Sequence, residues 1–278
     1  MLNVMETARG LVDKIGDLPP IPAVMMKSLE MLGNPDNAVK KIQDQIAIDQ
    51  SLTAYILKIA NSPLYGMRTE VSTLSHAITL MGYNTVRSVL LSFLARGYFH
   101  ARGSRLVQST LWKHSLASAV FGKAIAEATS RIPVEETFIA SLLHDIGKGV
   151  IFNNRTAEYE QVCERECNAE VSSIEAEMAV FGFTHVEVGY LVMKKWGFSG
   201  KIVETEVFHH QAQEADGSNL LVPAVSLANK LCHLNGYGFT KGHPDLFEIE
   251  QFGLSLQALE AIQDRARLEI EHYLEIFA

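Results

Sequence analysis

The stretch Ser141-Leu142-Leu143-His144-Asp145-Ile146-Gly147-Lys148 decides the fold, because it joins an apolar helix to two adjacent side chains that bind metals. The helix is expected to begin near Pro133, with Glu135 and Glu136 in the first turn, where carboxylates suit the positive helix end. His144 and Asp145 then fall at its C-terminal end, and Gly147 is expected to stop it. Its buried face is predicted to consist of Phe138, Ile139, Leu142, Leu143 and Ile146.

The neighbouring imidazole and carboxylate supply one borderline nitrogen ligand and one hard oxygen ligand. This mixture suits divalent ions such as Zn, Fe or Mn. Taken alone, the dipeptide His144-Asp145 also fits a surface charge beside a half-buried histidine.

Other histidines between positions 114 and 210 favour the metal hypothesis. His114 lies on a predicted upstream helix, and His209-His210 end a predicted helix downstream. Thr184 and Glu187 have the spacing of a capping box, which places His185 at the start of a helix. A protonated imidazole is disfavoured there by the helix dipole, so His185 is expected to be neutral and free to bind a metal. The other histidines are interpreted as ordinary surface or core residues: His76, His100, His233, His243 and His272.

The rest of the chain predicts an all-α protein. Apolar residues recur at helical spacing, as at Leu52, Ile56, Ile59 and Ala60, and no alternating pattern typical of a strand is present. We expect three parts: an N-terminal helical subdomain at 1–100, a metal-site subdomain at 101–235, and a C-terminal loop and packing helix at 236–278. The last helix is predicted to be amphipathic through Leu256, Leu259, Ile262, Leu268 and Ile270.

Composition narrows the classes of function. The 278 residues are 47% hydrophobic with a net charge of −8, which argues against a nucleic-acid partner that needs a basic face. The three cysteines form no CxxC pair, so a reducing compartment is expected. No signal peptide is visible and no apolar run reaches 18 residues, so the prediction is a cytoplasmic protein with no membrane partner.

The order His114, His144-Asp145, His185, His209-His210 resembles the ligand series of the HD superfamily of metal-dependent phosphohydrolases, and is most similar to its HDOD branch. The resemblance extends over roughly residues 18–211. It implies a compact, multi-helix, HD-superfamily-like bundle with an N-terminal helical subdomain, and a role in bacterial signalling. Its N-terminal motifs are Leu18-Pro19-Pro20-Ile21-Pro22, Asp49-Gln50-Ser51-Leu52, Ala60-Asn61-Ser62, Ala77-Ile78 and Leu80-Met81-Gly82, and a later one is residues 181–189 with Trp196.

By similarity to the related HD-GYP branch, His114, His144 and Asp145 hold one divalent metal ion. Asp145 then bridges to a second ion, bound by His185, His209 and His210. Lys148 matches a lysine near the substrate phosphate, so Asp145 and Lys148 are the candidate catalytic residues. Alternatively, Lys148 is a cation at the C-terminal end of a helix.

The sequence departs from the family pattern at two places. Where HD enzymes carry a further aspartate ligand, this chain reads Ala228-Asn229-Lys230-Leu231, so Asn229 would offer a carbonyl oxygen without charge. No Gly-Tyr-Pro sequence follows His210, so a cyclic di-GMP phosphodiesterase is not expected.

The leading hypothesis is an HDOD-type regulatory or output module that binds one or two ions of Fe, Mn or Zn in a structural or sensory role, with a signalling protein as partner. The alternative is a metal-dependent phosphohydrolase acting on a nucleotide or phosphodiester, with a phosphate-containing small molecule as ligand. A di-iron site that reacts with oxygen is a third possibility, since the ligand types permit it.

Overall fold

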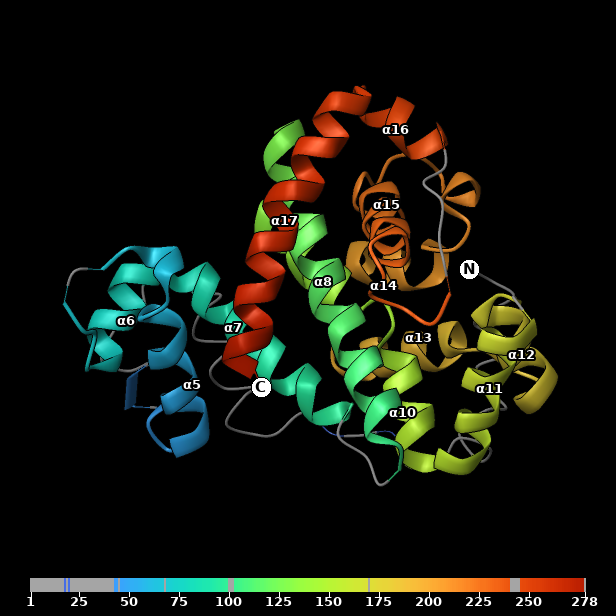
Figure 1. The fold of residues 1–278 in the computed structure, drawn as a ribbon, viewed down its shortest axis with the longest axis horizontal. Helices are drawn as coiled ribbons and strands as arrows, with labels where there is room; N and C mark the ends of the chain where they lie inside the picture. The colour runs from blue at the N-terminus through green and yellow to red at the C-terminus, as the bar shows by residue number, and fades with distance from the viewer. Residues whose placement is uncertain are drawn as a thin grey trace. The chain divides into compact units, whose positions relative to one another are not determined.

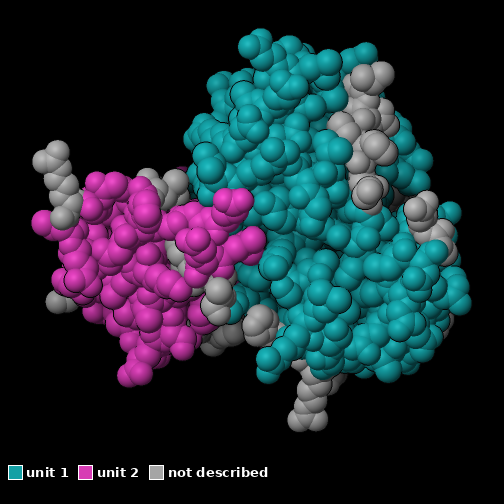
Figure 2. Space-filling view, in the orientation of Figure 1, with its two compact units in different colours: residues 1–19, 95–270 teal, residues 20–94, 271–278 magenta. Residues whose placement is uncertain are grey.

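The computed structural model describes residues 18, 20, 43, 44, 46–67, 69–99, 103–169, 171–240 and 246–277. Regular structure within these ranges is entirely helical, which confirms the predicted all-α class (Figure 1). The apolar faces predicted near residues 11–15 and 24–32 lie outside the described residues. Packing divides the chain into two units, coloured in Figure 2: unit 1 is Met1–Pro19 with Ala95–Ile270, and unit 2 is Pro20–Leu94 with Glu271–Ala278.

In unit 2, α5 (Gln50–Ala60) begins at Asp49, whose side chain accepts a hydrogen bond of 3.0 Å from the Leu52 backbone N–H. The four apolar residues predicted to form one face of this helix are all buried. A short 3₁₀ turn, η1 (Pro63–Tyr65), and two helices, α6 (Leu74–Met81) and α7 (Tyr83–Tyr98), follow. Helix α5 ends at Ala60, directly before Asn61-Ser62-Pro63, residue types that favour helix termination.

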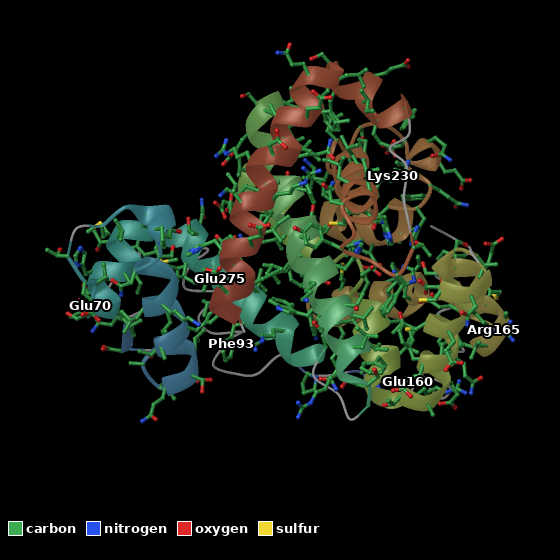
Figure 3. The ribbon with its side chains drawn as sticks, in the orientation of Figure 1. Glu70, Phe93, Glu160, Arg165, Lys230 and Glu275 are labelled. Atoms are coloured by element: carbon green, nitrogen blue, oxygen red, sulfur yellow. The ribbon has the colours of Figure 1, made fainter. Side chains whose placement is uncertain are left out.

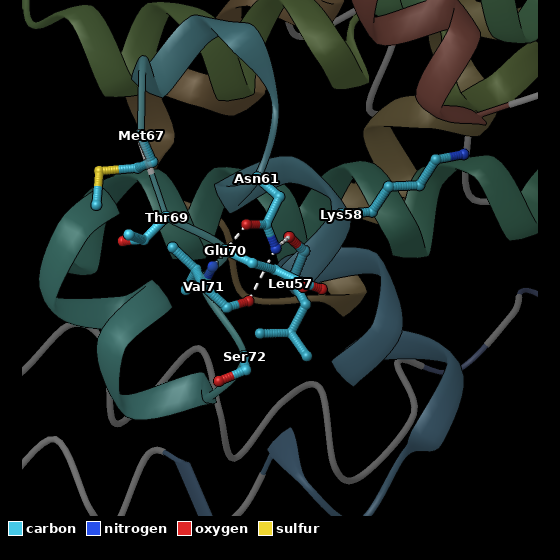
Figure 4. Close-up of a pocket in the computed structure, with 8 residues that line it drawn as sticks. All are labelled: Leu57, Lys58, Asn61, Met67, Thr69, Glu70, Val71 and Ser72. Carbon is cyan, nitrogen blue, oxygen red and sulfur yellow. Dashed lines mark hydrogen bonds between the residues drawn. The ribbon is translucent and has the colours of Figure 1, made fainter.

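Asn61 links the end of α5 to the segment that follows through two hydrogen bonds. Its side-chain amide donates to the Val71 carbonyl at 2.8 Å, and its side-chain oxygen accepts from the Val71 N–H at 2.7 Å (Figure 4). The paired bonds give the Ala60-Asn61-Ser62 motif a structural role. They also shape one wall of a pocket within unit 2, lined by Leu57, Lys58, Asn61, Met67, Thr69, Glu70, Val71 and Ser72.

Unit 1 is built around α8 (Arg105–Thr129), whose N-cap is Ser104 and whose side chains are buried from Leu116 to Phe121. Helix α9 (Val134–Leu143) lies close against it, because a Cβ at Gly122 would come within 2.2 Å of the Ser141 Oγ. The remaining helices of this unit are α10 (Ile146–Asn154), α11 (Thr156–Ala169), α12 (Ser173–Phe181), α13 (His185–Lys195), α14 (Gly200–Phe208), the 3₁₀ turn η2 (Ala212–Glu214), α15 (Leu221–Leu234), α16 (Leu246–Phe252) and α17 (Leu256–Phe277), which runs on into unit 2.

The helix stop predicted at Gly147 is wrong. Helix α9 does begin after Pro133 with two glutamates in its first turn, but it ends at His144, and α10 starts at Ile146. Gly147 is helical, and a Cβ there would lie 2.0 Å from the His185 carbonyl oxygen. The glycine therefore permits close contact between α10 and α13. Lys148 lies in the first turn of α10, so its reading as a C-terminal helix cation is also wrong.

Ion pairs join the C-terminal helices α16 and α17 to other helices of unit 1. Lys123 of α8 lies 2.7 Å from Glu269 of α17, and Lys230 of α15, labelled in Figure 3, lies 2.6 Å from the buried Glu248 of α16. Three of the five predicted apolar residues of α17 are buried. The other two, Leu256 and Leu268, are 73% and 72% exposed, so the predicted buried face is narrower than expected.

Among the described residues, no single helix is long and apolar enough to cross a membrane. The bent pair formed by α6 and most of α7 meets the test of length and composition, although much of its apolar surface, such as Ile78, Leu90 and Leu91, is buried in the protein.

Replacing Gly147 with alanine should destabilise the fold by about 1–3 kcal/mol, because the new methyl group meets backbone atoms of α13. Urea unfolding of the metal-free protein measures this loss as a lower midpoint at constant slope. Gly200→Ala at the start of α14 is the matched control, since a Cβ there has no neighbour within 4 Å. Equal midpoints for the two variants would contradict the proposed contact.

Candidate metal centre

Five helices, α8, α9, α10, α13 and α14, bring six of the predicted ligands to one place in unit 1. His114 lies in the middle of α8, and His144 and Asp145 occupy the break between α9 and α10. His185 opens α13 behind a capping box in which the Thr184 N–H donates to Glu187 at 2.9 Å, as predicted. His209 ends α14, and His210 follows it. The groups able to hold an ion are Asp145 with His185, His209 and His210, and Asp145 with His114 and His144.

The carboxylate of Asp145 is shared between these two groups. Its Oδ2 lies 3.3 Å from His114 Nε2 and 3.4 Å from His144 Nε2. Its Oδ1 lies 3.2 Å from His185 Nε2 and 3.5 Å from His209 Nε2. Each oxygen therefore faces one set of imidazoles, which is the arrangement of a carboxylate that bridges two ions.

The Nδ1 atom of each of four histidines has an acceptor from outside the centre. His114 Nδ1 lies 2.7 Å from the Tyr237 carbonyl, and His144 Nδ1 lies 2.7 Å from the Ser141 carbonyl. His185 Nδ1 lies 2.7 Å from Glu177 Oε2, and His209 Nδ1 lies 2.9 Å from the Glu206 carbonyl. A carbonyl or carboxylate acceptor places the proton on Nδ1 and leaves the Nε2 lone pair for a metal.

The Nε2 atoms of His114, His144, His185 and His209 consequently carry lone pairs, and the Nε2 atoms of neighbouring histidines face one another. His114 and His144 approach to 3.3 Å, His185 and His209 to 3.4 Å, and His210 and His185 to 3.1 Å. Lone pairs this close repel unless a cation lies among them. The donor set, imidazole nitrogen with one shared carboxylate, therefore fits one or two ions of Fe, Mn or Zn.

Burial favours the neutral imidazole at His114, His144, His185 and His210. It lowers the pKa of His114 and of His144 to about 3, against the raising effect of Asp145. It also lowers the pKa of His185 and His210 well below the usual range. Burial alone would raise the pKa of Asp145, but His144, Lys148 and His185 hold it well below its usual value. The centre is thus in the protonation state that binds metals.

Lys148 is the one cation among several buried acids beside the centre. Its Nζ lies 2.8 Å from Asp145 Oδ2, and although burial would lower its pKa, Asp145, Glu166 and Glu177 hold it above the usual value. Burial raises the pKa of Glu166 to about 7 and that of Glu177 to about 8. This excess of carboxyl groups over cations in a buried space is a second feature that fits bound divalent ions.

Asn229, the residue at the expected aspartate position, lies on α15 and is 5% exposed. Its side-chain oxygen has no hydrogen-bond partner. An unsatisfied buried oxygen is costly, and coordination of an ion would satisfy it. This oxygen is in keeping with the prediction that Asn229 is an uncharged ligand.

Three groups beside the centre are not among the residues predicted from the sequence to belong to it. Glu177 orients His185, and the Tyr237 carbonyl orients His114. The ring of His233 lies 4.9 Å from that of His114. The sequence did hold an indication for His233, because it follows Asn229 by one helical turn and so lies on the same face of the helix. No sequence signal marks the Tyr237 carbonyl, because every residue carries the same atom.

Together the fold and the centre define a helical domain of the HD type, with a shared aspartate between two histidine groups. The family model of the HDOD domain matches residues 18–212. The chain belongs to the HDOD domain family.

Solved structures agree in fold. An HDOD domain protein of unknown function from Geobacter sulfurreducens is 28% identical, with a TM-score of 0.82 over 97% of this chain and 96% of that one. A candidate metal-dependent phosphohydrolase from Shewanella amazonensis SB2B is 21% identical, with a TM-score of 0.69 over 98% and 100% of the two chains. At that identity the likeness concerns the fold alone.

An uncharacterised protein of Treponema pallidum is 24% identical over 232 residues, which are 81% of this chain. The match spans 44% of the relative's length, so less than half of that protein corresponds to this chain.

Replacing Glu177 with glutamine should weaken metal binding by about 10–100-fold, because Glu177 Oε2 contacts both the His185 backbone N–H and its Nδ1, and an amide holds the ring in this orientation less well. Titration of the metal-free protein with Zn²⁺ against a competing chelator measures the change. The matched control is Glu164→Gln, an exposed position on α11 that should leave the affinity unaltered. Equal affinity in the two variants would remove Glu177 from the centre.

Proposed function

We propose that this chain is a regulatory or output module of bacterial signal transduction, in which one or two divalent metal ions have a structural or sensory role. The module would act in the cytoplasm on a signalling protein as partner. The observation that carries this proposal is the closure of the centre. His144 and His185 are 0% exposed, and Asp145 and His209 are 1% exposed.

Closed metal sites are typical of structural roles, whereas catalytic sites keep a ligand position open to water or substrate. The amide at Asn229 supports the same interpretation, since it leaves Asp145 as the one carboxylate among the predicted ligands. The ammonium group of Lys148 is engaged by Asp145 and is buried, so a phosphate group would have to compete for it.

A second candidate function rests on the bridging position of Asp145. Two ions held by a shared carboxylate supply a metal-activated water and charge neutralisation for phosphate-ester hydrolysis. Under this proposal Lys148 would neutralise charge on a phosphoryl oxygen, and half-buried His210 would lie toward the entry for a nucleotide or phosphodiester. The candidate phosphohydrolase among the structural relatives is in keeping with it.

Elemental analysis of the purified chain, beside His144→Ala and His210→Ala, tests the proposal. We expect one or two equivalents of Fe, Mn or Zn in the wild type, with about one equivalent or more lost in each variant, because each removes a ligand from a different group. His76→Ala on α6 is the control, since that side chain is exposed and belongs to unit 2. A wild type that stays metal-free after incubation with these ions would overturn the metal-binding proposal.

The loaded protein is then assayed with a panel of nucleotides and phosphodiesters. The regulatory proposal expects no turnover that depends on His144. Turnover that is abolished by His144→Ala would overturn that proposal and establish the phosphohydrolase instead.

A further inference from the structure

Residues beyond the segment that matches the HDOD family model complete one side of the centre. The model ends at residue 212, whereas α15 and the loop that follows it come later in the chain. Two side chains of α15, Asn229 and His233, are four residues apart and so lie on one face of the helix. The buried, unpartnered oxygen of Asn229 and the contact of His233 with His114 both belong to this face.

The separation of His233 from His114 has the value found between ligand histidines. Where two of the five predicted ligand histidines are in contact, their ring centroids are 4.1–5.5 Å apart. The shortest separation is that of His209 and His210, and the longest is that of His185 and His209. The His233 and His114 rings are 4.9 Å apart, within that range.

His233 is also oriented as the ligand histidines are. Its Nδ1 lies 3.1 Å from the Thr240 carbonyl, so the proton is held on that nitrogen and the Nε2 lone pair is left for another group. The same loop supplies the Tyr237 carbonyl to His114. Gly238 lies between them, and a Cβ at that position would approach His233 Nδ1 to 2.5 Å. The loop therefore packs around two imidazoles and contacts the Nδ1 side of each.

We propose that His233 binds the metal ion of the His114, His144 and Asp145 group through its Nε2, together with Asn229. The inference rests on the proposed metal-binding function and adds a ligand to it. His233 is outside the group of atoms that lie within 4.8 Å of one another, so its ring must turn toward the ion. It lies half-buried in the last turn of α15, where a side chain has more rotamer freedom than in the fully buried core.

A third imidazole changes the chemistry of this ion. With His233, the donor set becomes three neutral nitrogens, one shared carboxylate and one amide oxygen. Imidazole-rich sets favour Fe²⁺ and Zn²⁺, whereas carboxylate-rich sets favour Mn²⁺ and Mg²⁺. His233 would thereby compensate in affinity for the carboxylate that Asn229 lacks, and would select the later transition metals.

The test is titration of the metal-free full chain with Zn²⁺ and, separately, Mn²⁺, each against a competing chelator. We expect His233→Ala to weaken one of the two Zn²⁺ equivalents by about tenfold or more, with a smaller loss for Mn²⁺. His76→Ala is the matched control and should bind as the wild type does. His233→Gln preserves volume and serves if the alanine variant fails to fold.

Two further readouts separate a ligand from a residue that only packs against the centre. The visible absorption spectrum of the Co²⁺-loaded protein should change in His233→Ala, since it reports the ligand set. Adding Asn229→Asp to His233→Ala should recover affinity and shift the preference toward Mn²⁺. Affinities within twofold of wild type and an unchanged Co²⁺ spectrum would overturn the inference, while leaving the metal-binding proposal intact. A wild type that binds no metal would instead overturn both.

Discussion

The rest of unit 1 depends on the placement of one carboxylate, that of Asp145, among four imidazole nitrogens at 3.2–3.5 Å. A continuous helix through residues 134–154 would point successive side chains in directions about 100° apart. The break between α9 and α10 instead lets His144 and Asp145 face the same centre. The second half of the predicted ligand set then requires α13 to approach α10, and the absence of a side chain at Gly147 permits this approach, while Gly189 leaves room on α13 for the Glu206 side chain of α14.

The same placement explains why so much charge is buried at one point. Burying carboxyl groups without compensation is costly, yet Glu166, Glu177 and Glu206 are all buried near Asp145. Lys148 supplies a single positive charge, and its ammonium group lies 2.8 Å from Asp145 Oδ2. Among the described residues neither carboxyl oxygen of Glu206 has a hydrogen-bond partner, and burial together with Asp145 raises its pKa well above the usual value despite the opposing effect of Lys148, which favours a neutral acid. Protons neutralise part of this cluster, and the divalent ions proposed above would displace them on binding.

Features carried by side-chain identity and helical spacing could be predicted from the sequence. They include the all-α class, the capping box before His185, the buried face of α5 and the convergence of six ligand residues. The break after His144 could not be predicted, because Gly147 is as typical of a helix stop as of a close helix contact. The decision between the two comes from α13, which is distant in sequence.

Two other outcomes show where local patterns fail. Leu256 and Leu268 have the spacing of a buried face but are exposed, because the position of α8 relative to α17 decides which side is covered. From the sequence His233 is interpreted as an ordinary surface or core residue, and its proposed role follows from a loop that returns to the centre. The assignment of Asn229 came from comparison with a family motif, and its unpartnered oxygen gives that assignment a physical basis.

The use of main-chain carbonyls to hold His114, His144 and His233 has a consequence for how this centre tolerates change over evolution. A carbonyl oxygen is the same whatever residue bears it, so these contacts depend on where the backbone of Ser141, Tyr237 and Thr240 lies and not on the identity of their side chains. The length of the connection after α15 does matter for two of them. Insertion or deletion of a single residue there would shift both acceptors out of register, and would disable the centre while every ligand in the chain remained unaltered.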